Sequence, residues 1–388
     1  MKLPRHALRA LHALKALKTL ALVLLLAAPA FAQIAPPGPN DPDMTVDVRT
    51  KSAVIDSLAY QLRHVYVFPD VAEKIAKSLE KRRAAHEYDR ITSAKEFADS
   101  LTVDLQSVNH DLHLRAGYRH EPIPANDGDG APPAAEIQRQ HEADRVRNFG
   151  FEQLRRLPGN IGYLDLRAFS GDPDAQPVAV AAMNWLANTD ALIIDLRRNG
   201  GGDPVLLNTL ITYLTEPGER RLINTFYMRQ DDRTEQFYTS PYVPGPRYLG
   251  KPVVVLTSHR TGSCAEEFSY DIQTMKLGTL LGQTTAGAAH PGGFVRLSEH
   301  FAAFIAMGRP INPVTKKDWE GVGVVPEIDV PAADALREAQ VRLLGILKDK
   351  AAEDPERAAG LAHAIEDAKK LPSENADDFE RRRPSVKH

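Results

Sequence analysis

The second half of the chain alternates short apolar runs with longer helical segments, and this alternation limits the folds that it can adopt. The runs I-G-Y-L-D-L, A-L-I-I-D-L and V-V-V-L-T are short and rich in branched aliphatic residues, as buried strands are. From Gly159 onward the pattern predicts strands at 161–166, 191–196, 253–257 and 279–282, helices at 178–185, 204–214 and 265–275, and two paired strands at 294–297 and 302–307. Such alternation predicts an α/β domain around a mostly parallel sheet.

The part of the chain before this alternation has a helical pattern. Val71, Ile75 and Leu79 repeat on one helix face, and Ser93 with Glu96 forms a capping box. The expected organisation is a flexible linker at 33–45, a helical domain at 46–118, a linker with a short exposed helix at 119–150, an α/β domain at 151–345, and a charged helix and tail at 346–388. From Pro372 onward we expect the tail to be disordered.

The first 32 residues have the pattern of a secretory signal peptide. Five basic residues without an acid precede the apolar stretch Leu20–Ala28, and an A-x-A cleavage signal follows at Ala30–Ala32. The apolar stretch is too short to span a bilayer as a mature helix, although an uncleaved membrane anchor is the alternative. We therefore expect an exported protein, periplasmic or secreted, without a membrane span in its mature chain.

Charge and cysteine content exclude some partners. Removing the leader, with its five basic residues, changes the formal net charge from −3 to −8. A mildly acidic chain does not favour nucleic acid or anionic lipid. The one cysteine, Cys264, cannot form an internal disulfide.

Several common catalytic motifs are absent from the sequence. It contains no G-x-S-x-G, no H-E-x-x-H, no G-x-x-x-x-G-K-[ST] and no C-x-x-C. A typical lipase, the common metalloenzymes and nucleotide-binding enzymes are therefore disfavoured. We expect neither a metal nor an organic cofactor.

Two predicted strands end in segments that suit chemistry. The strand at 191–196 leads into R-R-N-G-G-G, and three successive glycines let backbone N–H groups approach a phosphate or an oxyanion, whereas a tight turn would need only one. The strand at 253–257 leads into S-H-R-T-G-S-C-A-E-E, which places Ser263 at the start of a helix. The free N–H groups and the dipole of the helix suit a nucleophile there, but Ser263 and Glu266 also fit a capping box. Taken alone, the pattern favours the helix cap, because capping boxes are far more common than catalytic serines.

Four motifs in order resemble one family. N-H-D-L-H-L-R at 109–115, the glycine run, T-G-S-C-A-E at 261–266 and D-W-E-G-V-G-V-V-P-E at 318–327 are similar to the tail-specific, or C-terminal processing, proteases. The resemblance covers about residues 46–344. It implies a serine peptidase with a ClpP/crotonase-like α/β domain after a small helical domain.

The base distinguishes two branches of that family. Ala288, in G-Q-T-T-A-G-A-A, stands where one branch has its lysine base, and 119–150 is too short to hold the PDZ domain that this branch usually carries. The chain looks like the branch of the tricorn protease core and the interphotoreceptor retinoid-binding protein, in which the base is a histidine. Because the stretch 119–150 is so short, we expect no PDZ domain.

The resemblance implies a catalytic trio of Ser263, His113 and Glu320. Ser263 would attack, His113 would take its proton, and Glu320 would orient and stabilise the imidazole. Leu112 replaces the serine that relays between histidine and glutamate in the tricorn protease. Glu320 therefore contacts His113 directly or through water, or Asp111 takes part.

The same resemblance places the oxyanion hole at the N–H groups of Gly201 or Gly202, taken jointly, and of Cys264. Rival assignments are Cys264 as the nucleophile and His259 or His110 as the base. His290 is expected in a loop at the border of the cleft, where it could contact substrate or merely be polar.

The expected function is that of an exported serine-type endopeptidase. Its substrate would be an unstructured peptide, an unfolded protein or a protein C-terminus. Two alternatives stay open: a binding protein for apolar ligands with little or no catalysis, as in the retinoid-binding relatives, and a hydrolase of non-peptide esters or amides.

Overall fold

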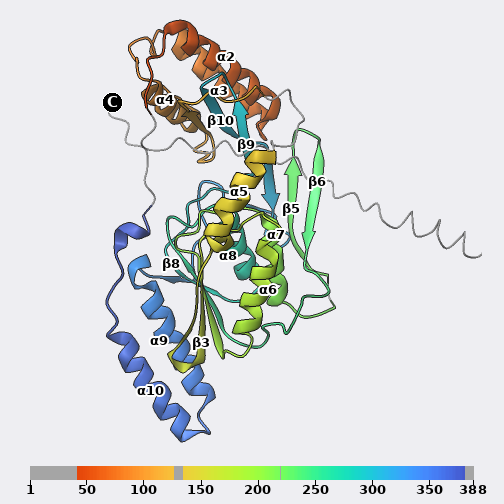
Figure 1. The fold of residues 1–388 in the computed structure, drawn as a ribbon, viewed down its shortest axis with the longest axis vertical. Coiled ribbons are helices and arrows are strands. Elements are labelled where there is room, and N and C mark those ends of the chain that lie inside the picture. The colour runs from red at the N-terminus through yellow and green to blue at the C-terminus, as the bar shows by residue number, and fades with distance from the viewer. Residues whose placement is uncertain (1–41, 126–133, 219, 381–388) are drawn as a thin grey trace, which may run out of the picture.

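The computed structural model describes residues 42–125, 134–218 and 220–380. The predicted signal peptide lies outside the described residues. Figure 1 shows an N-terminal helical unit at one end, a central sheet below it, and two C-terminal helices along the outer side of that sheet. None of the helices described is both long and apolar enough to cross a membrane.

A six-stranded sheet forms the core of the larger unit. Its strands lie in the order β12–β8–β7–β4–β3–β2, and all neighbours are parallel except β2 and β3, which are antiparallel. The strands are β2 (Phe151–Leu157), β3 (Ile161–Leu166), β4 (Ala191–Asp195), β7 (Val253–Thr257), β8 (Thr279–Gly282) and β12 (Ile328–Asp329). The predicted α/β class with a mostly parallel sheet is confirmed.

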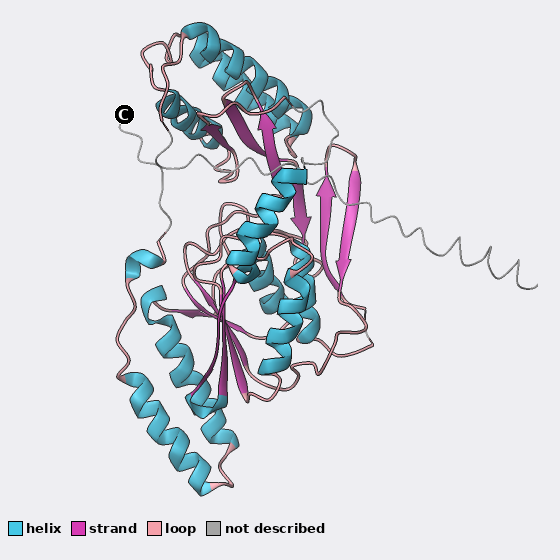
Figure 2. Cartoon of the chain, in the orientation of Figure 1, coloured by secondary structure: helices cyan, strands magenta, loops and turns pink. Residues whose placement is uncertain are grey.

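Helices cover both faces of this sheet (Figure 2). One face packs against α6 (Ala175–Leu186), α7 (Pro204–Tyr213) and α8 (Cys264–Thr274), and the other against α9 (Ala332–Lys350) with α10 (Pro355–Lys369). Successive residues of a strand point to opposite faces, so Leu192 and Ile194 join the first core while Ile193 joins the second. Because both faces are buried, the inner strands β4 and β7 are mostly apolar rather than alternating, whereas the edge strand β2 carries charged and exposed residues.

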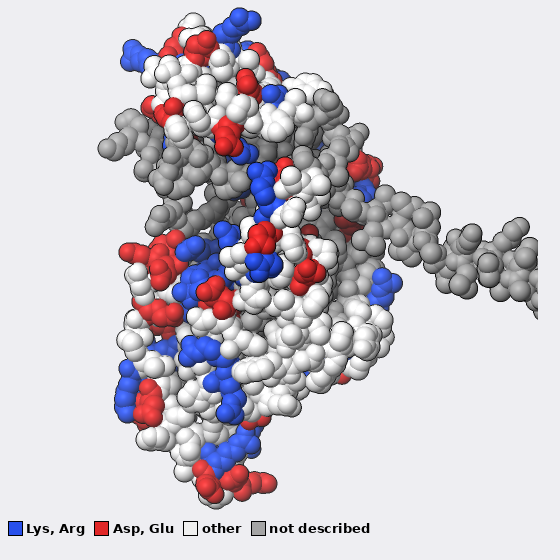
Figure 3. All heavy atoms as spheres, in the orientation of Figure 1, with Lys and Arg blue, Asp and Glu red and all other residues white. Residues whose placement is uncertain are grey.

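The two helical layers differ in charge. Neither α6 nor α7 contains a Lys, Arg, Asp or Glu, whereas α9 and α10 carry many. Figure 3 shows both signs of charge mixed along the edge that the C-terminal helices form, and a mostly uncharged surface over α6 and α7.

The N-terminal unit is not built from helices alone. Helices α2 (Val48–Val65), α3 (Pro69–Ala84) and α4 (Ala94–Gln106) pack on an antiparallel sheet of β1 (Arg115–Tyr118), β10 (Phe301–Ala306) and β9 (Gly292–Arg296). The predicted pairing of the last two strands is confirmed, but they bury their side chains in the N-terminal core. The ring of Phe301, for example, lies 5.6 Å from that of Phe97 on α4.

Several elements were not expected from the sequence. A second antiparallel sheet consists of β5 (Leu222–Met228), β6 (Arg233–Tyr238) and β11 (Gly308–Ile311), in the order β11–β5–β6.

The short exposed helix that the sequence predicts in the linker is present as α5 (Ala134–Val146), and none of its residues is buried.

Two segments expected to be flexible are held in place. In the linker predicted at 33–45, the carboxylate of Asp43 accepts the Ser93 hydroxyl at 2.6 Å, and Thr45 forms a β-bridge with Ser93. Residues 372–380 of the predicted disordered tail are also packed, because Glu374 pairs with Arg197 at 2.5 Å and Phe379 is buried. Residues 42–45 of the expected flexible linker and 372–380 of the expected disordered tail are therefore ordered, contrary to those expectations.

A double-mutant cycle between Phe97 and Phe301 tests whether the late strands belong to the N-terminal core. We expect the free-energy changes of Phe97→Leu and Phe301→Leu, measured by urea unfolding, to differ from additivity by about 0.5–1.5 kcal/mol. Either single change already removes the contact between the two rings, so the double variant cannot lose it again. Phe268→Leu, in the other core, should add to Phe97→Leu without coupling. Strict additivity of the Phe97 and Phe301 changes would contradict the shared core.

Candidate active site

Ser263 occupies a strained corner between β7 and α8. Its backbone has φ 52° and ψ −123°, a conformation that residues other than glycine rarely adopt. Ser263 is also the N-cap residue of α8. An ordinary N-cap serine has an extended backbone, so capping does not account for this conformation. The Glu266 carboxylate accepts the N–H of Ser263 at 2.8 Å, which is the reciprocal half of a capping box. The half-buried hydroxyl is thus mounted at the positive end of a helix.

The glycine run lies directly against this corner. A Cβ at Gly201 would lie 2.7 Å from the Cβ of Ser263 and 3.0 Å from the nitrogen of Cys264, and Gly201 has φ 113°. Gly202 has φ 141°, and a Cβ there would lie 1.9 Å from the carbonyl oxygen of Phe169. Both positions therefore require glycine, the first for contact with Ser263 and the second for contact with the neighbouring loop.

The predicted oxyanion donors are not equivalent. The N–H of Gly201 already donates to the Asn199 side-chain oxygen at 2.9 Å, so it is not available to a substrate. The N–H groups of Gly202 and Cys264 have no acceptor within residues 42–125, 134–218 and 220–380. This hydrogen bond favours Gly202 over Gly201 as the first donor, and the oxyanion hole with Cys264 stays a prediction.

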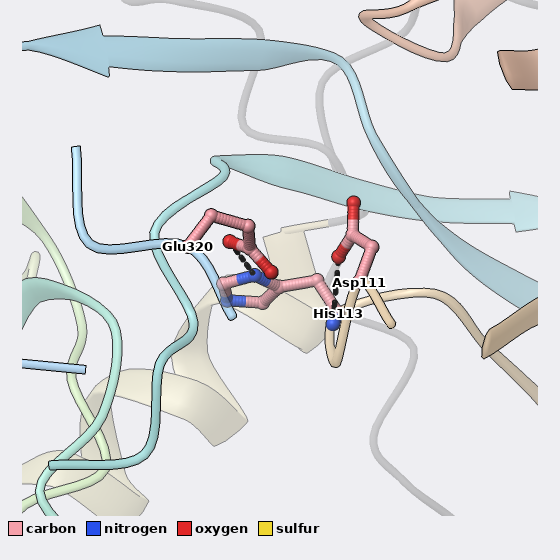
Figure 4. Close-up of side chains that lie close together, drawn as sticks. All are labelled: Asp111, His113 and Glu320. Carbon is pink, nitrogen blue, oxygen red and sulfur yellow. Dashed lines mark hydrogen bonds and ion pairs between the residues drawn. The ribbon is translucent and has the colours of Figure 1, made fainter. Parts of the chain in front are cut away.

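His113 and Glu320 come from distant parts of the chain and face one another (Figure 4). His113 follows α4, whereas Glu320 lies in the loop between β11 and β12. The Nδ1 atom of His113 is 3.9 Å from Oε2 of Glu320, and its ring stacks on Phe304 of β10. The Asp111 carboxylate accepts the backbone N–H of His113 at 3.0 Å, so Asp111 holds the turn rather than the ring.

A second histidine, His290, completes this cluster. Its Nδ1 lies 3.3 Å from Oδ2 of Asp111 and 3.4 Å from Oε2 of Glu320, and its Nε2 lies 3.8 Å from Oδ2 of Asp318. Only 3% of His290 is exposed. The sequence placed His290 in a loop near the cleft but contained no sign of this role, because its acidic neighbours come from two other segments, one at Asp111 and one at 318–320.

These contacts set the charges in the cluster. Burial would lower the pKa of His290, but the surrounding carboxylates of Asp111, Asp318 and Glu320 raise it to about 9. Burial raises the pKa of Glu320 to about 7, and the charge of Asp111 adds to this effect. Burial would also raise the pKa of Asp111, but the hydrogen bond and charge of His290 outweigh it and hold that pKa below its usual value. At neutral pH His290 is therefore the cation that balances the acids.

One loop connects the two halves of the site. The Glu266 carboxylate, beside Ser263, accepts the N–H groups of Gly287 at 2.6 Å and Ala288 at 2.9 Å. The Glu320 carboxylate accepts the next two N–H groups along the loop, those of Ala289 and His290, at 2.6 and 3.1 Å. Four successive backbone donors thus link Glu266, beside Ser263, to Glu320, beside His113.

The ligand atoms of Asp111, His113 and Glu320 lie within 4.8 Å of one another, which is close enough for a metal ion. Both oxygens of Asp111, however, already accept hydrogen bonds, from Tyr66, His113 and His290. A second group of this kind, His141 with Asp172 and Asp174, lies nearer the surface. Neither group has a further feature that favours a metal.

Two family models match the chain. The model described as peptidase family S41 matches residues 160–330, and the model of the N-terminal domain of peptidase S41 in eukaryotic IRBP matches residues 46–147. The chain belongs to peptidase family S41. The family predicted from the four motifs is therefore confirmed, and membership makes the protein a serine-type peptidase that acts on a peptide or protein.

Solved structures share the fold of this S41 peptidase. A candidate peptidase from Parabacteroides merdae is 20% identical with a TM-score of 0.52, over 76% of this chain and 96% of that chain. Mature CPAF is 12% identical with a TM-score of 0.52, over 83% of this chain and 97% of that chain. At these identities the likeness is one of fold, and it agrees with the predicted catalytic α/β domain and helical N-terminal unit.

The rival residues in this S41 peptidase are less suitable than Ser263 and His113. Burial raises the pKa of the Cys264 thiol well above its ordinary value, which disfavours the thiolate. His259 is exposed, and its Nδ1 lies 2.9 Å from the carbonyl oxygen of Thr284. His110 is exposed as well.

The charge on His290 should make the stability of the protein depend on pH. Because its folded-state pKa, about 9, exceeds its ordinary value of 6.5, the charge stabilises the fold fully below about pH 6.5. This contribution is lost as the pH rises through 9. We expect His290→Gln to lower the free energy of unfolding most in acid, with a gap to wild type that narrows between pH 6.5 and 9.

Urea unfolding from about pH 6 to about pH 10 measures this gap. His259→Gln is the matched control, because that ring is exposed. A gap between wild type and His290→Gln that stays constant over the range would contradict a charged His290.

Proposed function

We propose that this protein is an exported serine endopeptidase that cleaves unstructured peptides or protein C-termini, with Ser263 as nucleophile, His113 as base and Glu320 as its support. The observation that carries the proposal is the strained Ser263 corner packed against Gly201, together with two nearby backbone N–H groups that have no acceptor in the part of the chain that the structure describes. Strain of this kind persists where function needs a side chain aimed in one direction.

Attack by the Ser263 oxygen on a peptide carbonyl would create a negative charge on the carbonyl oxygen. The N–H of Cys264 adjoins Ser263 in the chain, and Gly202 follows Gly201, which packs against Ser263. Both N–H groups are fixed by the backbone, so they would stabilise this charge without reorganising. Gly201 contributes by its lack of a side chain, which lets the two loops touch.

His113 would take the Ser263 proton during attack and return it to the leaving amine. The resulting acyl-enzyme would be hydrolysed by water, with His113 acting as base again. Glu320 stabilises the imidazolium that forms in each step. Its 3.9 Å distance from Nδ1 exceeds a hydrogen bond, so the two groups must approach when substrate binds.

The origin of these residues favours an extended substrate. Ser263 lies in the α/β unit, whereas His113 belongs to the turn that follows the N-terminal helices. The scissile bond must reach both, so it lies where the two units meet. An unstructured segment can enter such a place more readily than a folded domain can.

We also propose export, on the basis of the leader at residues 1–32. Mass spectrometry of the protein purified from its own cells would test this. A mature N-terminus at Gln33 is expected, and an intact leader in the cytoplasm would exclude export.

Matched variants of neighbouring residues test the nucleophile. With an unfolded protein as substrate, Ser263→Ala should lower kcat by at least about 10³-fold, because no other group attacks. Cys264→Ala should keep kcat within about threefold, because its contribution is a backbone N–H. Mass spectrometry of the products should show internal cuts or shortened C-termini that require Ser263.

Three results would contradict the proposal. Loss of activity in Cys264→Ala with activity retained in Ser263→Ala would make the thiol the nucleophile. Hydrolysis of esters but of no peptide would favour a different hydrolase. Tight binding of apolar ligands without any hydrolysis would favour a binding protein.

A further inference from the structure

The chain continues beyond both family models into a segment that contacts the loops of the active site. The S41 model ends at residue 330, and α9 and α10 follow it. Residues 373–379 then return along the sheet's C-terminal edge, where the Glu374 N–H donates to the carbonyl oxygen of Ala333 at 2.9 Å. We call residues 373–379 the strap.

The strap closes over Arg197, which immediately precedes the loop of the glycine run. Arg197 is fully buried, and its guanidinium donates to Asp195, to the carbonyl oxygen of Ala332 at 2.6 Å and to Glu374 at 2.5 Å. The ring of Phe379 lies 4.4 Å from the same guanidinium and is itself 1% exposed. A buried cation is costly unless it is paired. The strap supplies Glu374, one of the two carboxylates that pair with Arg197, and the ring of Phe379, which covers the guanidinium.

The strap also reaches the nucleophile loop. Arg260 lies three residues before Ser263, and its guanidinium donates to the carbonyl oxygen of Asp378 at 2.8 Å. The ring of Phe379 also lies 5.3 Å from the guanidinium of Arg198. A single segment therefore holds side chains from both loops.

These two loops are bonded to one another beneath the strap. The Ser258 hydroxyl donates to the carbonyl oxygen of Arg197 at 2.5 Å, and the Thr261 hydroxyl donates to that of Leu196 at 2.8 Å. The N–H of Gly262 donates to the carbonyl oxygen of Asn199 at 3.0 Å. A shift of Arg197 would therefore move the loop that carries Gly202 relative to the loop that carries Ser263 and Cys264.

We propose that the strap positions the glycine loop and the nucleophile loop for catalysis, with Glu374 and Phe379 as positioning residues that act through Arg197. The proposal rests on the proposed function of Ser263 and Gly202. It has a regulatory consequence: a peptidase that shortens protein C-termini would lose its own activity if its chain were trimmed past Phe379.

Point variants of the full-length chain test the strap. Phe379→Ala should lower kcat for peptide hydrolysis about 10- to 100-fold with little change in KM, because misplaced oxyanion donors weaken transition-state binding more than substrate binding. Phe379→Tyr should restore kcat, because it keeps the ring over the guanidinium. Glu374→Gln should show the same direction of change as Phe379→Ala.

The control is Leu371→Ala, which lies just before the strap and is half exposed. It should leave kcat unchanged. A kcat for Phe379→Ala that equals that of wild type, or one that falls only in proportion to the folded fraction, would overturn the positioning role.

Hydrogen–deuterium exchange gives a readout that does not depend on the chemistry. Peptides covering 196–203 and 258–264 should exchange faster in Phe379→Ala than in wild type, even if Ser263 proves not to be the nucleophile. Unchanged exchange would overturn the strap, whereas full activity of Ser263→Ala would overturn the proposed function instead. Faster exchange together with unchanged kcat would also overturn the strap's role in catalysis.

Discussion

The buried carboxylate of Glu266 is the interaction on which the arrangement of the site depends. It accepts hydrogen bonds from the N–H of Ser263, the hydroxyl of Thr285 and the N–H groups of Gly287 and Ala288. Burial raises its pKa to about 7, although these hydrogen bonds oppose the change. Through this one group the start of α8 and the loop after β8 hold fixed positions, so Ser263 and the loop that leads to Glu320 are positioned together.

The second half of the site depends on a similar device. Glu320 accepts the N–H groups of Ala289 and His290, and the His290 side chain in turn bridges Glu320 and Asp111. The proposed base, His113, therefore lies among charges that balance one another: the acids Asp111 and Glu320, and the histidine His290, whose proton these acids hold. Ala288 donates its backbone N–H to Glu266, and His290, two residues further along the same loop, supplies the positive charge.

The sequence predicted the parts of the fold whose signals are local. Strands β4 and β7 are continuous apolar runs, and the glycines and Ser263 follow them directly, so the carboxyl edge of the sheet could be inferred before the structure. Strand β1 could not be predicted from the sequence, because R-A-G-Y is short and is stabilised by pairing with β10, far along the chain. The same reason explains why β9 and β10 were assigned to the α/β domain although their side chains fill the N-terminal core.

The site shows the same division. Ser263, His113 and Glu320 were inferred from motifs, and the structure brings the last two together. Which glycine donates could not be inferred, because it depends on the Asn199 side chain occupying the N–H of Gly201. The order of residues 372–380 was missed because a charged segment with one aromatic residue resembles a disordered tail until Arg197 supplies the surface that Phe379 covers.

The most direct measurement of the central claim is the location of a fluorophosphonate adduct. The purified protein would be treated with the reagent and digested, and the modified residue identified by mass spectrometry. We expect the adduct on Ser263, formed much more slowly in His113→Gln, since the probe reports the activated hydroxyl rather than any one substrate. An adduct on Cys264 or Ser258, or no adduct on the correctly folded wild-type protein, would contradict the assignment of Ser263 as the nucleophile.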